Sequence, residues 1–217
     1  MAGAWERTYS VLCAILHTDN TTIAWAFGLR QLQLPGTVIG LAGMPFDHAR
    51  NAACMKALEI GATHLFFLDS DVIPPPDTVL RLLAHDLPIV SGVYHRRSTP
   101  HGVPVMLKDG RWVTDAPKNS LVEVDLVGAG CLLIRRDVLE KLPPIDPDRG
   151  KHWFSWRVDA ASVLPRGEAL SEDFAFNLHC KRHGFKTMVD TSIQCLHVGY
   201  AAATYGQFSP LDGNRVA

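Results

Sequence analysis

Short apolar runs alternate with longer segments of mixed polarity over the first 95 residues of the chain. Short runs bounded by turn residues predict strands, here at Tyr9–Leu16, Thr37–Leu41, His64–Leu68 and Pro88–Tyr94. The segments between them carry caps and helical apolar spacing, and they predict helices from Ile23 to about Leu32, Asp47 to about Ile60 and Asp77 to about His85. Strands that alternate with helices indicate an α/β fold with a mostly parallel central sheet.

The pattern changes after residue 95. An Asp109-Gly110 pair at the centre of Val103–Val113 predicts a β-hairpin. The other elements are expected as strands at Val122–Val127, Cys131–Ile134 and Lys186–Leu196, helices at Asp137–Leu142 and Glu172–His183, and an irregular segment at Pro143–Arg166. This half therefore predicts a smaller antiparallel part. Because no repeat or clear linker divides the chain, we expect a single domain over residues 1–217.

The composition is that of a folded protein, with 47% hydrophobic and 20% charged residues among 217. A formal net charge of −1 leaves no bulk positive field for nucleic acid or an anionic membrane. The longest apolar stretches, such as residues 11–16, are far shorter than the ~20 residues of a transmembrane helix. The sequence therefore predicts no membrane span and no bulk binding to polyanions.

The cysteines and the N-terminus bear on the compartment. Five cysteines without a Cys-x-x-Cys pair argue against a disulfide framework and a zinc ribbon, and we expect buried, reduced thiols. No small-residue cleavage site follows the apolar run at residues 11–16. The sequence therefore predicts no secretory signal and a cytoplasmic location.

The first candidate for chemistry is Asp69-Ser70-Asp71, which follows the apolar run His64–Leu68 directly. In open α/β sheets, ligands bind at the carboxyl ends of the strands. Two carboxylates at that place can hold a hard divalent cation, which commonly meets substrate phosphates as well. An acidic turn that leads into a helix cap is the common alternative, but two charges at the exit of a buried strand favour a cationic partner.

Several segments of the chain, taken in their order, carry a family resemblance. They are Ala49-Arg50-Asn51, Asp69-Ser70-Asp71, Val127–Ile134, Ser171-Glu172-Asp173 and Leu196–Gly199. With them the chain resembles the GT-A glycosyltransferases, in particular family-2-like members, from about Tyr9 to Gly199. The resemblance implies a single Rossmann-like GT-A domain, with a nucleotide-sugar-binding half at about 1–95 and an acceptor-binding half at about 96–217.

The resemblance also implies a donor site. The donor would be a nucleoside diphosphate sugar, a UDP- or GDP-sugar, whose diphosphate is bridged to the protein by Mn²⁺ or Mg²⁺. Asp71 would bind the metal directly, Asp69 would lie closer to the ribose or sugar hydroxyls within the same metal set, and His197 would complete that set or touch the phosphates. Arg50 would neutralise the diphosphate or orient Asp69.

Two further residues are assigned by the resemblance to the nucleotide. His17 and Asp19 follow the first strand, where the family usually holds the nucleotide base.

A general base is expected in the late helix. Ser171 is the expected N-cap, and Glu172 and Asp173 then lie in the first helical turn. Asp173 is our candidate for the base that takes a proton from an acceptor hydroxyl, in a direct displacement with inversion, and Glu172 is the competing candidate. Acidic residues in a first turn also complement the helix dipole, which is the alternative for both.

Other residues have a chemical and a structural interpretation each. His179 and His183 are four apart and suit a metal, but surface or packing histidines are the more common outcome. Gly128 and Gly130 suit a close approach of substrate or a bulge.

The loop residues are weighed in the same way. His95-Arg96-Arg97 suits a phosphorylated ligand or a solvated loop. Trp153 and Trp156 suit stacking on a sugar face or attachment of a long loop to the core, and their position in a loop favours acceptor binding.

Two other function classes compete with the transferase. A haloacid-dehalogenase-like phosphohydrolase would use Asp69 as nucleophile, but in that family the motif follows the first strand and a Gly-containing loop comes next. A non-catalytic nucleotide-sugar-binding protein would leave Glu172 and Asp173 without a role. The sequence leaves the acceptor open, which could be a saccharide, a protein, a small molecule or a modified nucleic-acid base. It also leaves the oligomeric state open.

Overall fold

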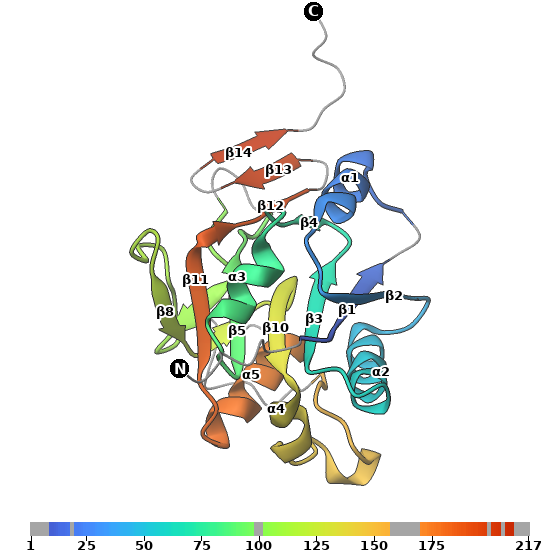
Figure 1. Ribbon diagram of the computed structural model, residues 1–217. Helices are drawn as coiled ribbons and strands as arrows, with labels where there is room; N and C mark the ends of the chain where they lie inside the picture. Colours follow the sequence, from blue (N-terminus) through green and yellow to red (C-terminus); the bar gives the residue numbers. More distant parts are fainter. Residues whose placement is uncertain are drawn as a thin grey trace, which may run out of the picture.

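Seven strands form the central sheet in the order β2–β1–β3–β10–β5–β11–β8 (Figure 1). The computed structural model describes residues 9–17, 20–97, 102–156, 170–198, 201–204 and 207–210. The strands of this sheet are β1 (Val11–His17), β2 (Gly36–Ala42), β3 (His64–Asp69), β5 (Ile89–Val93), β8 (Leu121–Val124), β10 (Cys131–Arg135) and β11 (Thr187–Gln194). All are parallel except β10 and β8, which are antiparallel to their neighbours. The predicted α/β fold with a mostly parallel sheet is confirmed.

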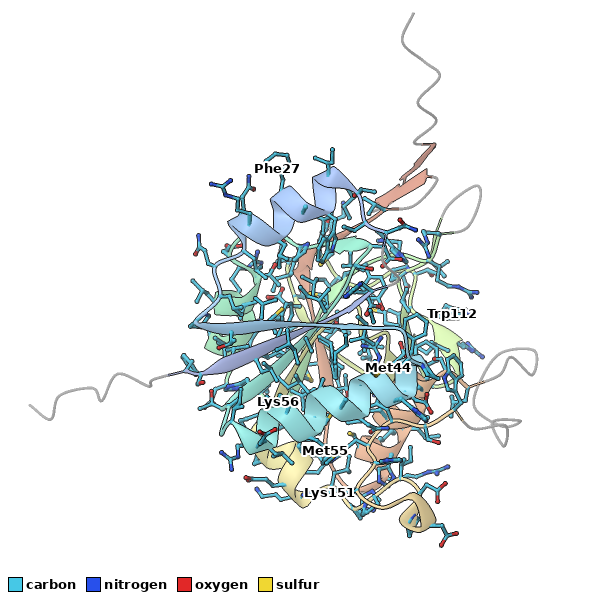
Figure 2. The ribbon with its side chains drawn as sticks, turned by 90° about the vertical axis from the view of Figure 1, so that its right-hand side faces the viewer. Phe27, Met44, Met55, Lys56, Trp112 and Lys151 are labelled. Carbon is cyan, nitrogen blue, oxygen red and sulfur yellow. The ribbon has the colours of Figure 1, made fainter. Side chains whose placement is uncertain are left out.

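Helices cover both faces of this sheet. They are α1 (Ile23–Gln31), α2 (Phe46–Glu59), α3 (Thr78–Ala84), α4 (Arg136–Lys141) and α5 (Glu172–Arg182), with one 3₁₀ turn, η1, at Pro147–Arg149. Figure 2 shows α1 on one side of β1 and β2 and α2 on the other. No helix within the described ranges combines the length and the apolar character that crossing a bilayer requires.

Alternate residues of β1 enter two separate cores. Leu12, Ala14 and Leu16 pack on the side of α2, whereas Val11 and Cys13 pack on the side of α1 and α3. A strand covered on both faces needs apolar side chains at every position, which explains the continuous apolar runs in the sequence. All five cysteines are buried and free, as expected.

Two small antiparallel sheets complete the fold. One has the order β7–β6–β9, from Arg111–Trp112, Met106–Lys108 and Leu126–Val127. Asp109 and Gly110 join β6 to β7 with φ angles of 50° and 70°, which is the left-handed pair that a tight hairpin turn requires. The predicted hairpin is confirmed.

The second small sheet positions the end of the chain. Its order is β14–β13–β12–β4, from Gln207–Pro210, Ala201–Thr204, Leu196–His197 and Val72–Ile73. His197 in β12 lies opposite Val72 in β4. This pairing brings a C-terminal histidine beside the acidic motif that follows β3.

Two strand predictions need correction. The run predicted as one strand at Val122–Val127 is divided between β8 and β9, because Asp125 turns away to accept hydrogen bonds from the Asp109 N–H at 2.8 Å and from Lys181 at 2.7 Å. The last predicted strand is likewise divided into β11 and β12, since the Cys195 N–H donates to the Val93 carbonyl between them.

Candidate active site

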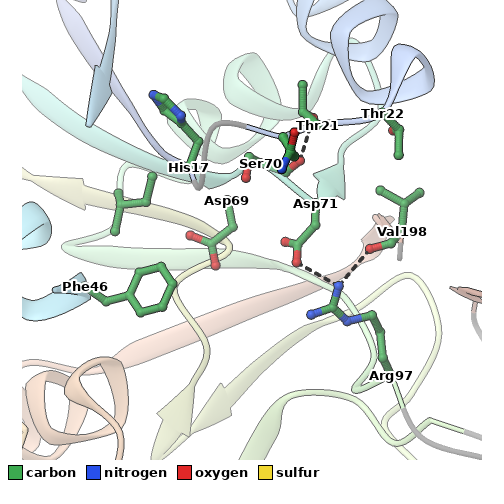
Figure 3. Close-up of a pocket in the computed structure, with 11 residues that line it drawn as sticks. His17, Thr21, Thr22, Phe46, Asp69, Ser70, Asp71, Arg97 and Val198 are labelled. Carbon is green, nitrogen blue, oxygen red and sulfur yellow. Dashed lines mark hydrogen bonds and ion pairs between the residues drawn. The ribbon is translucent and has the colours of Figure 1, made fainter. Parts of the chain in front are cut away.

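Two carboxylates stand where β3 ends at the carboxyl edge of the sheet. Asp69 is the last residue of β3, and Asp71 lies just before β4. The Asp69 N–H donates to the Gly130 carbonyl at 3.1 Å, and the Asp71 carbonyl accepts from the Val198 N–H at 2.7 Å. Both side chains project into one cleft (Figure 3). The backbone therefore holds the acidic motif at the edge where α/β sheets bind ligands.

Arg50, on α2, holds Asp69 from the protein interior. Its side chain is only 3% exposed; Nε donates to Glu172 Oε1 at 3.0 Å and Nη2 to Asp69 Oδ1 at 3.2 Å. Burial works against the charge of Arg50, but the charges of Asp69 and Glu172 outweigh it and raise the pKa of the guanidinium. Nη1 is buried without a hydrogen-bond partner among the described residues. These contacts provide what the predicted orienting role of Arg50 requires.

Asp71 faces Arg97 and His197 on the open side of the cleft. Arg97 Nη1 lies 3.0 Å from Asp71 Oδ2 and donates to the Val198 carbonyl at 3.0 Å, and His197 Nε2 lies 3.4 Å from the same carboxylate oxygen. Burial pushes the pKa of Asp71 upward, but the hydrogen bond and charge of His197 and the charge of Arg97 hold it below its ordinary value. Asp71 is therefore an anion that is available to a cationic ligand.

A carbonyl group sets the proton position on His197. Nδ1 lies 2.7 Å from the His95 carbonyl oxygen, which can only accept, so Nδ1 carries the proton. In the neutral ring the lone pair of Nε2 then faces Asp71. A lone pair and a carboxylate oxygen at 3.4 Å are a suitable pair of donors for a divalent cation.

The predicted metal set of Asp69, Asp71 and His197 is brought together only in part. Asp71 and His197 meet, whereas Asp69 directs Oδ1 to Arg50. In the part of the chain that the structure describes, no group of three or more His, Cys, Asp or Glu side chains could hold a metal ion. The two donors at Asp71 thus fit a cation that takes its other ligands from water and substrate phosphates, which is the usual habit of Mg²⁺.

The cleft contains two adjoining cavities that meet at Asp69. The larger, of about 570 Å³, is lined by Asp69, Asp71 and Arg97 (Figure 3). The other, of about 370 Å³, is lined by Asp173 and shares Asp69 and Phe46 with the first. Asp69 thus lies between a cavity lined by Asp71 and Arg97 and a cavity lined by Asp173.

A third cavity extends the cleft toward α1. It has a volume of about 280 Å³, is lined by Trp25, Leu29 and Gly40, and shares His17 and Thr21 with the cavity lined by Asp71. Its apolar walls and flat aromatic ring suit a planar ring. His17, which the resemblance assigns to the nucleotide base, lines this cavity, and Asp19 lies outside the described residues.

Glu172 and Asp173 open α5 in different environments, although both line the second cavity. Glu172 is buried against Arg50, and burial together with the charge of Asp173 raises its pKa to about 7. Asp173 is partly exposed; its Oδ2 accepts from the Ala129 N–H at 3.1 Å, and its Oδ1 accepts from the Ser171 hydroxyl and the Phe174 N–H. Asp173 is the more accessible acid, and Glu172 anchors Arg50.

Tyr94 explains the two glycines that the sequence left open. A Cβ at Gly128 would lie 1.9 Å from the Tyr94 hydroxyl oxygen, and the Gly130 N–H donates to that oxygen at 3.1 Å. The Tyr94 ring also lies edge-on to His197, with centroids 5.4 Å apart. The close approach is therefore made by Tyr94, which supports both the glycine turn and the histidine.

The two tryptophans have opposite roles. Trp153 is 1% exposed and its Nε1 donates to the Leu139 carbonyl at 3.0 Å, so its expected role in acceptor binding is wrong. Trp156 is 51% exposed and lines the second cavity with Trp112, over which Arg96 lies at 4.9 Å. The sequence could not separate the two, because both occur in the same irregular segment.

The remaining residues are easily placed. His183 Nδ1 lies 2.9 Å from the His179 carbonyl oxygen and His179 Nε2 lies 2.8 Å from the Pro143 carbonyl oxygen, so both rings contact backbone carbonyl groups near the surface. Arg97 remains 44% exposed but pairs with Asp71, so its side chain takes part in the cleft. Phe46, 46% exposed between two cavities, was missed, because an aromatic residue at the start of a helix normally signals core.

Comparisons with known proteins support the fold. No protein-family model matches the chain, and no curated protein matches it. Among solved structures, the crystal structure of A197 from STIV is similar, with a TM-score of 0.64, 18% identity and coverage of 93% of each chain. At this identity, the likeness shows that the two proteins share a fold: a single-domain α/β architecture around a mostly parallel seven-stranded sheet.

Proposed function

We propose that this protein is a metal-dependent GT-A glycosyltransferase that moves a sugar from a nucleoside diphosphate sugar to an acceptor hydroxyl. One observation carries the proposal. Asp71 and His197, far apart in the sequence, lie 3.4 Å apart, and the cavity that Asp71 lines meets at Asp69 a second cavity that is lined by a partly exposed acid, Asp173. The family resemblance of the motifs around Asp69 and Glu172 supports the same activity, and the shared fold with A197 from STIV is compatible with it.

The donor would occupy the two cavities on the side of Asp71. The nucleotide base would lie in the cavity lined by Trp25 and His17, and the diphosphate would lie near Arg97, which lines the adjoining cavity. Asp71 and His197 would hold Mn²⁺ or Mg²⁺, which would neutralise charge on the leaving nucleoside diphosphate. Asp69, oriented by Arg50, is free at Oδ2 to accept hydrogen bonds from hydroxyl groups of the ribose or sugar.

The acceptor would occupy the cavity on the side of Asp173. Its hydroxyl oxygen attacks the anomeric carbon while Asp173 accepts the hydroxyl proton. The bond from that carbon to the diphosphate oxygen breaks, and its electron pair leaves with the nucleoside diphosphate. With the acceptor in the cavity lined by Asp173 and the diphosphate in the adjoining cavity, attack opposite the leaving group would invert the configuration.

The test is release of nucleoside diphosphate from a panel of UDP- and GDP-sugars with Mn²⁺. We expect release by the wild type. The rate of release should fall on the order of 100-fold in Asp71→Asn, because the cation that Asp71 would hold no longer neutralises charge on the leaving group. Asp77→Asn is the matched control, since Asp77 is also a partly exposed acid, with 52% of its side chain exposed, but lies outside the cleft. No release with any donor, or equal rates in Asp71→Asn and wild type, contradicts the proposal.

A second variant tests the base. Asp173→Asn should abolish transfer while the dissociation constant of the donor, measured by calorimetry, stays within about twofold. Undiminished transfer would remove Asp173 from the role. A covalent phosphate on Asp69, detected by mass spectrometry after incubation with a phosphomonoester, would instead favour the phosphohydrolase.

A further inference from the structure

Exposed apolar side chains concentrate on one edge of the molecule. Among the described residues, most of the exposed large hydrophobic side chains belong to α1, β2, α2 and their connections: Ile23, Phe27, Val38, Met44, Phe46, Met55 and Ile60. Phe46 serves the cleft, but Ile23 is 76% exposed, Phe27 58% and Met55 59%, and none of these three lines a cavity of the cleft. Concentrated apolar exposure of this kind marks an interaction surface.

The backbone of the same edge is open. β2 is the outermost strand of the seven-stranded sheet and pairs only with β1, so one side of its seven residues has no strand partner in the described structure. Figure 2 looks onto this edge, with α1 and Phe27 on one side of β2 and α2 and Met55 on the other. An edge of this kind accepts another strand through its free N–H and C=O groups.

The opposite edge of the sheet is protected in a way that β2 is not. β8 carries Glu123, which forms ion pairs with Lys108 at 3.4 Å and Lys186 at 2.8 Å. Charges on an edge strand oppose pairing with another chain. β2 has the sequence Gly-Thr-Val-Ile-Gly-Leu-Ala, which contains no charged residue and no proline that would oppose pairing with another strand.

We propose that β2 pairs antiparallel with β2 of a second copy of this chain and forms a homodimer with a continuous sheet. A twofold axis perpendicular to the sheet relates such strands and keeps each face on the same side. Phe27 and Ile23 of α1 then meet their own copies on one face, and Met55 of α2 meets its copy on the other. An uncharged strand meets its copy without repulsion, which favours a second copy over a charged peptide as the occupant.

The test is the mass of the full-length protein in solution by sedimentation velocity, over a range of concentrations. We expect twice the 23.9 kDa of one chain for the wild type. Val38→Lys places two like charges at the junction and should weaken the dimer on the order of 100-fold, as close like charges do at interfaces. Circular dichroism and the melting temperature of the isolated monomer report whether this variant is folded, and Phe27→Glu provides a second disruption on the helix.

The matched control is Leu121→Lys. Leu121 lies on β8, the other edge strand, and is 41% exposed against 44% for Val38, so the same substitution tests the opposite edge. This variant should stay dimeric. A monomeric wild type, a dimer that persists in both Val38→Lys and Phe27→Glu, or a dimer lost in Leu121→Lys would overturn the proposal. These measurements do not depend on any enzymatic activity.

Discussion

Asp69 and Asp71 are separated by one residue and have opposite electrostatic environments. Asp69 is held by a buried guanidinium, and burial raises its pKa in spite of Arg50. Asp71 contacts His197 and the half-exposed Arg97, and these contacts lower the pKa of Asp71. Both carboxylates line the cleft, but Asp69 is tied to an internal ionic network and Asp71 to side chains nearer the surface, so equal chemistry in a short motif does not mean equal roles.

The cationic partner of Asp69 cannot be replaced by a ligand as easily as the cationic partner of Asp71. Arg50 is tied to both Asp69 and Glu172, and losing any member leaves a buried charge without a partner. Arg97 lies at the surface of the cleft, where solvent can take its place. A ligand cation can therefore compete at Asp71 at low cost, but not at Asp69.

The largest expected effect is a loss of stability when the buried arginine, Arg50, is removed. Arg50→Ala leaves two carboxylates without their cation and should lower the free energy of unfolding by about 3–5 kcal/mol, measured by urea denaturation. Arg136→Ala removes an exposed pair with Glu140 and should cost less than ~1 kcal/mol. Similar losses in the two variants would mean that the Arg50 network is not a structural support.

The next effect distinguishes the two carboxylates by metal affinity. Asp71→Asn should weaken Mn²⁺ binding in the presence of UDP or GDP on the order of 10- to 100-fold, as changes close to metal sites do. Asp69→Asn should weaken it less, because Asp69 is directed to Arg50. Mn²⁺ titration followed by electron paramagnetic resonance measures both, and the reverse order would exchange the roles assigned here.

The smallest effect is a pH dependence of stability. The pKa of Glu172 is raised from 4.5 to about 7, so the folded state binds a proton more tightly than the unfolded state. Its contribution is fully present below pH 4.5 and is lost as the pH rises through about 7. Between pH 5.5 and 7 the wild type should lose about 1–2 kcal/mol of unfolding free energy that Glu172→Gln does not lose. Parallel pH profiles of the two proteins would contradict this assignment.

Local features were predicted well from the sequence. The helix expected at Glu172–His183 with Ser171 as its N-cap is α5, and the Asp109-Gly110 turn joins β6 and β7. Such elements depend on spacing, caps and turn residues within a few positions. The antiparallel insertion of β10 between β3 and β5 could not be predicted in the same way, because strand order depends on pairing between distant segments.

In the candidate site, too, local motifs were predictable from the sequence and long-range contacts were not. Asp69, Asp71, Glu172, Asp173 and His197 were found from short motifs, and the structure places all of them at the cleft or its wall. Their individual environments were not predictable. Nothing local shows that Glu172 turns to a buried arginine or that Trp153 enters the core while Trp156, three residues later, remains exposed.

The amino-acid sequence by itself determined which segments become strands and helices, and which acids stand at the end of β3. Those properties follow from apolar periodicity and from residue types that act on their own neighbours. Only the tertiary structure decided that β4 pairs with β12 and that His197 comes to 3.4 Å from Asp71. Such a contact closes a loop of more than a hundred residues, and its formation depends on the packing of the whole sheet rather than on any local preference of the residues that meet.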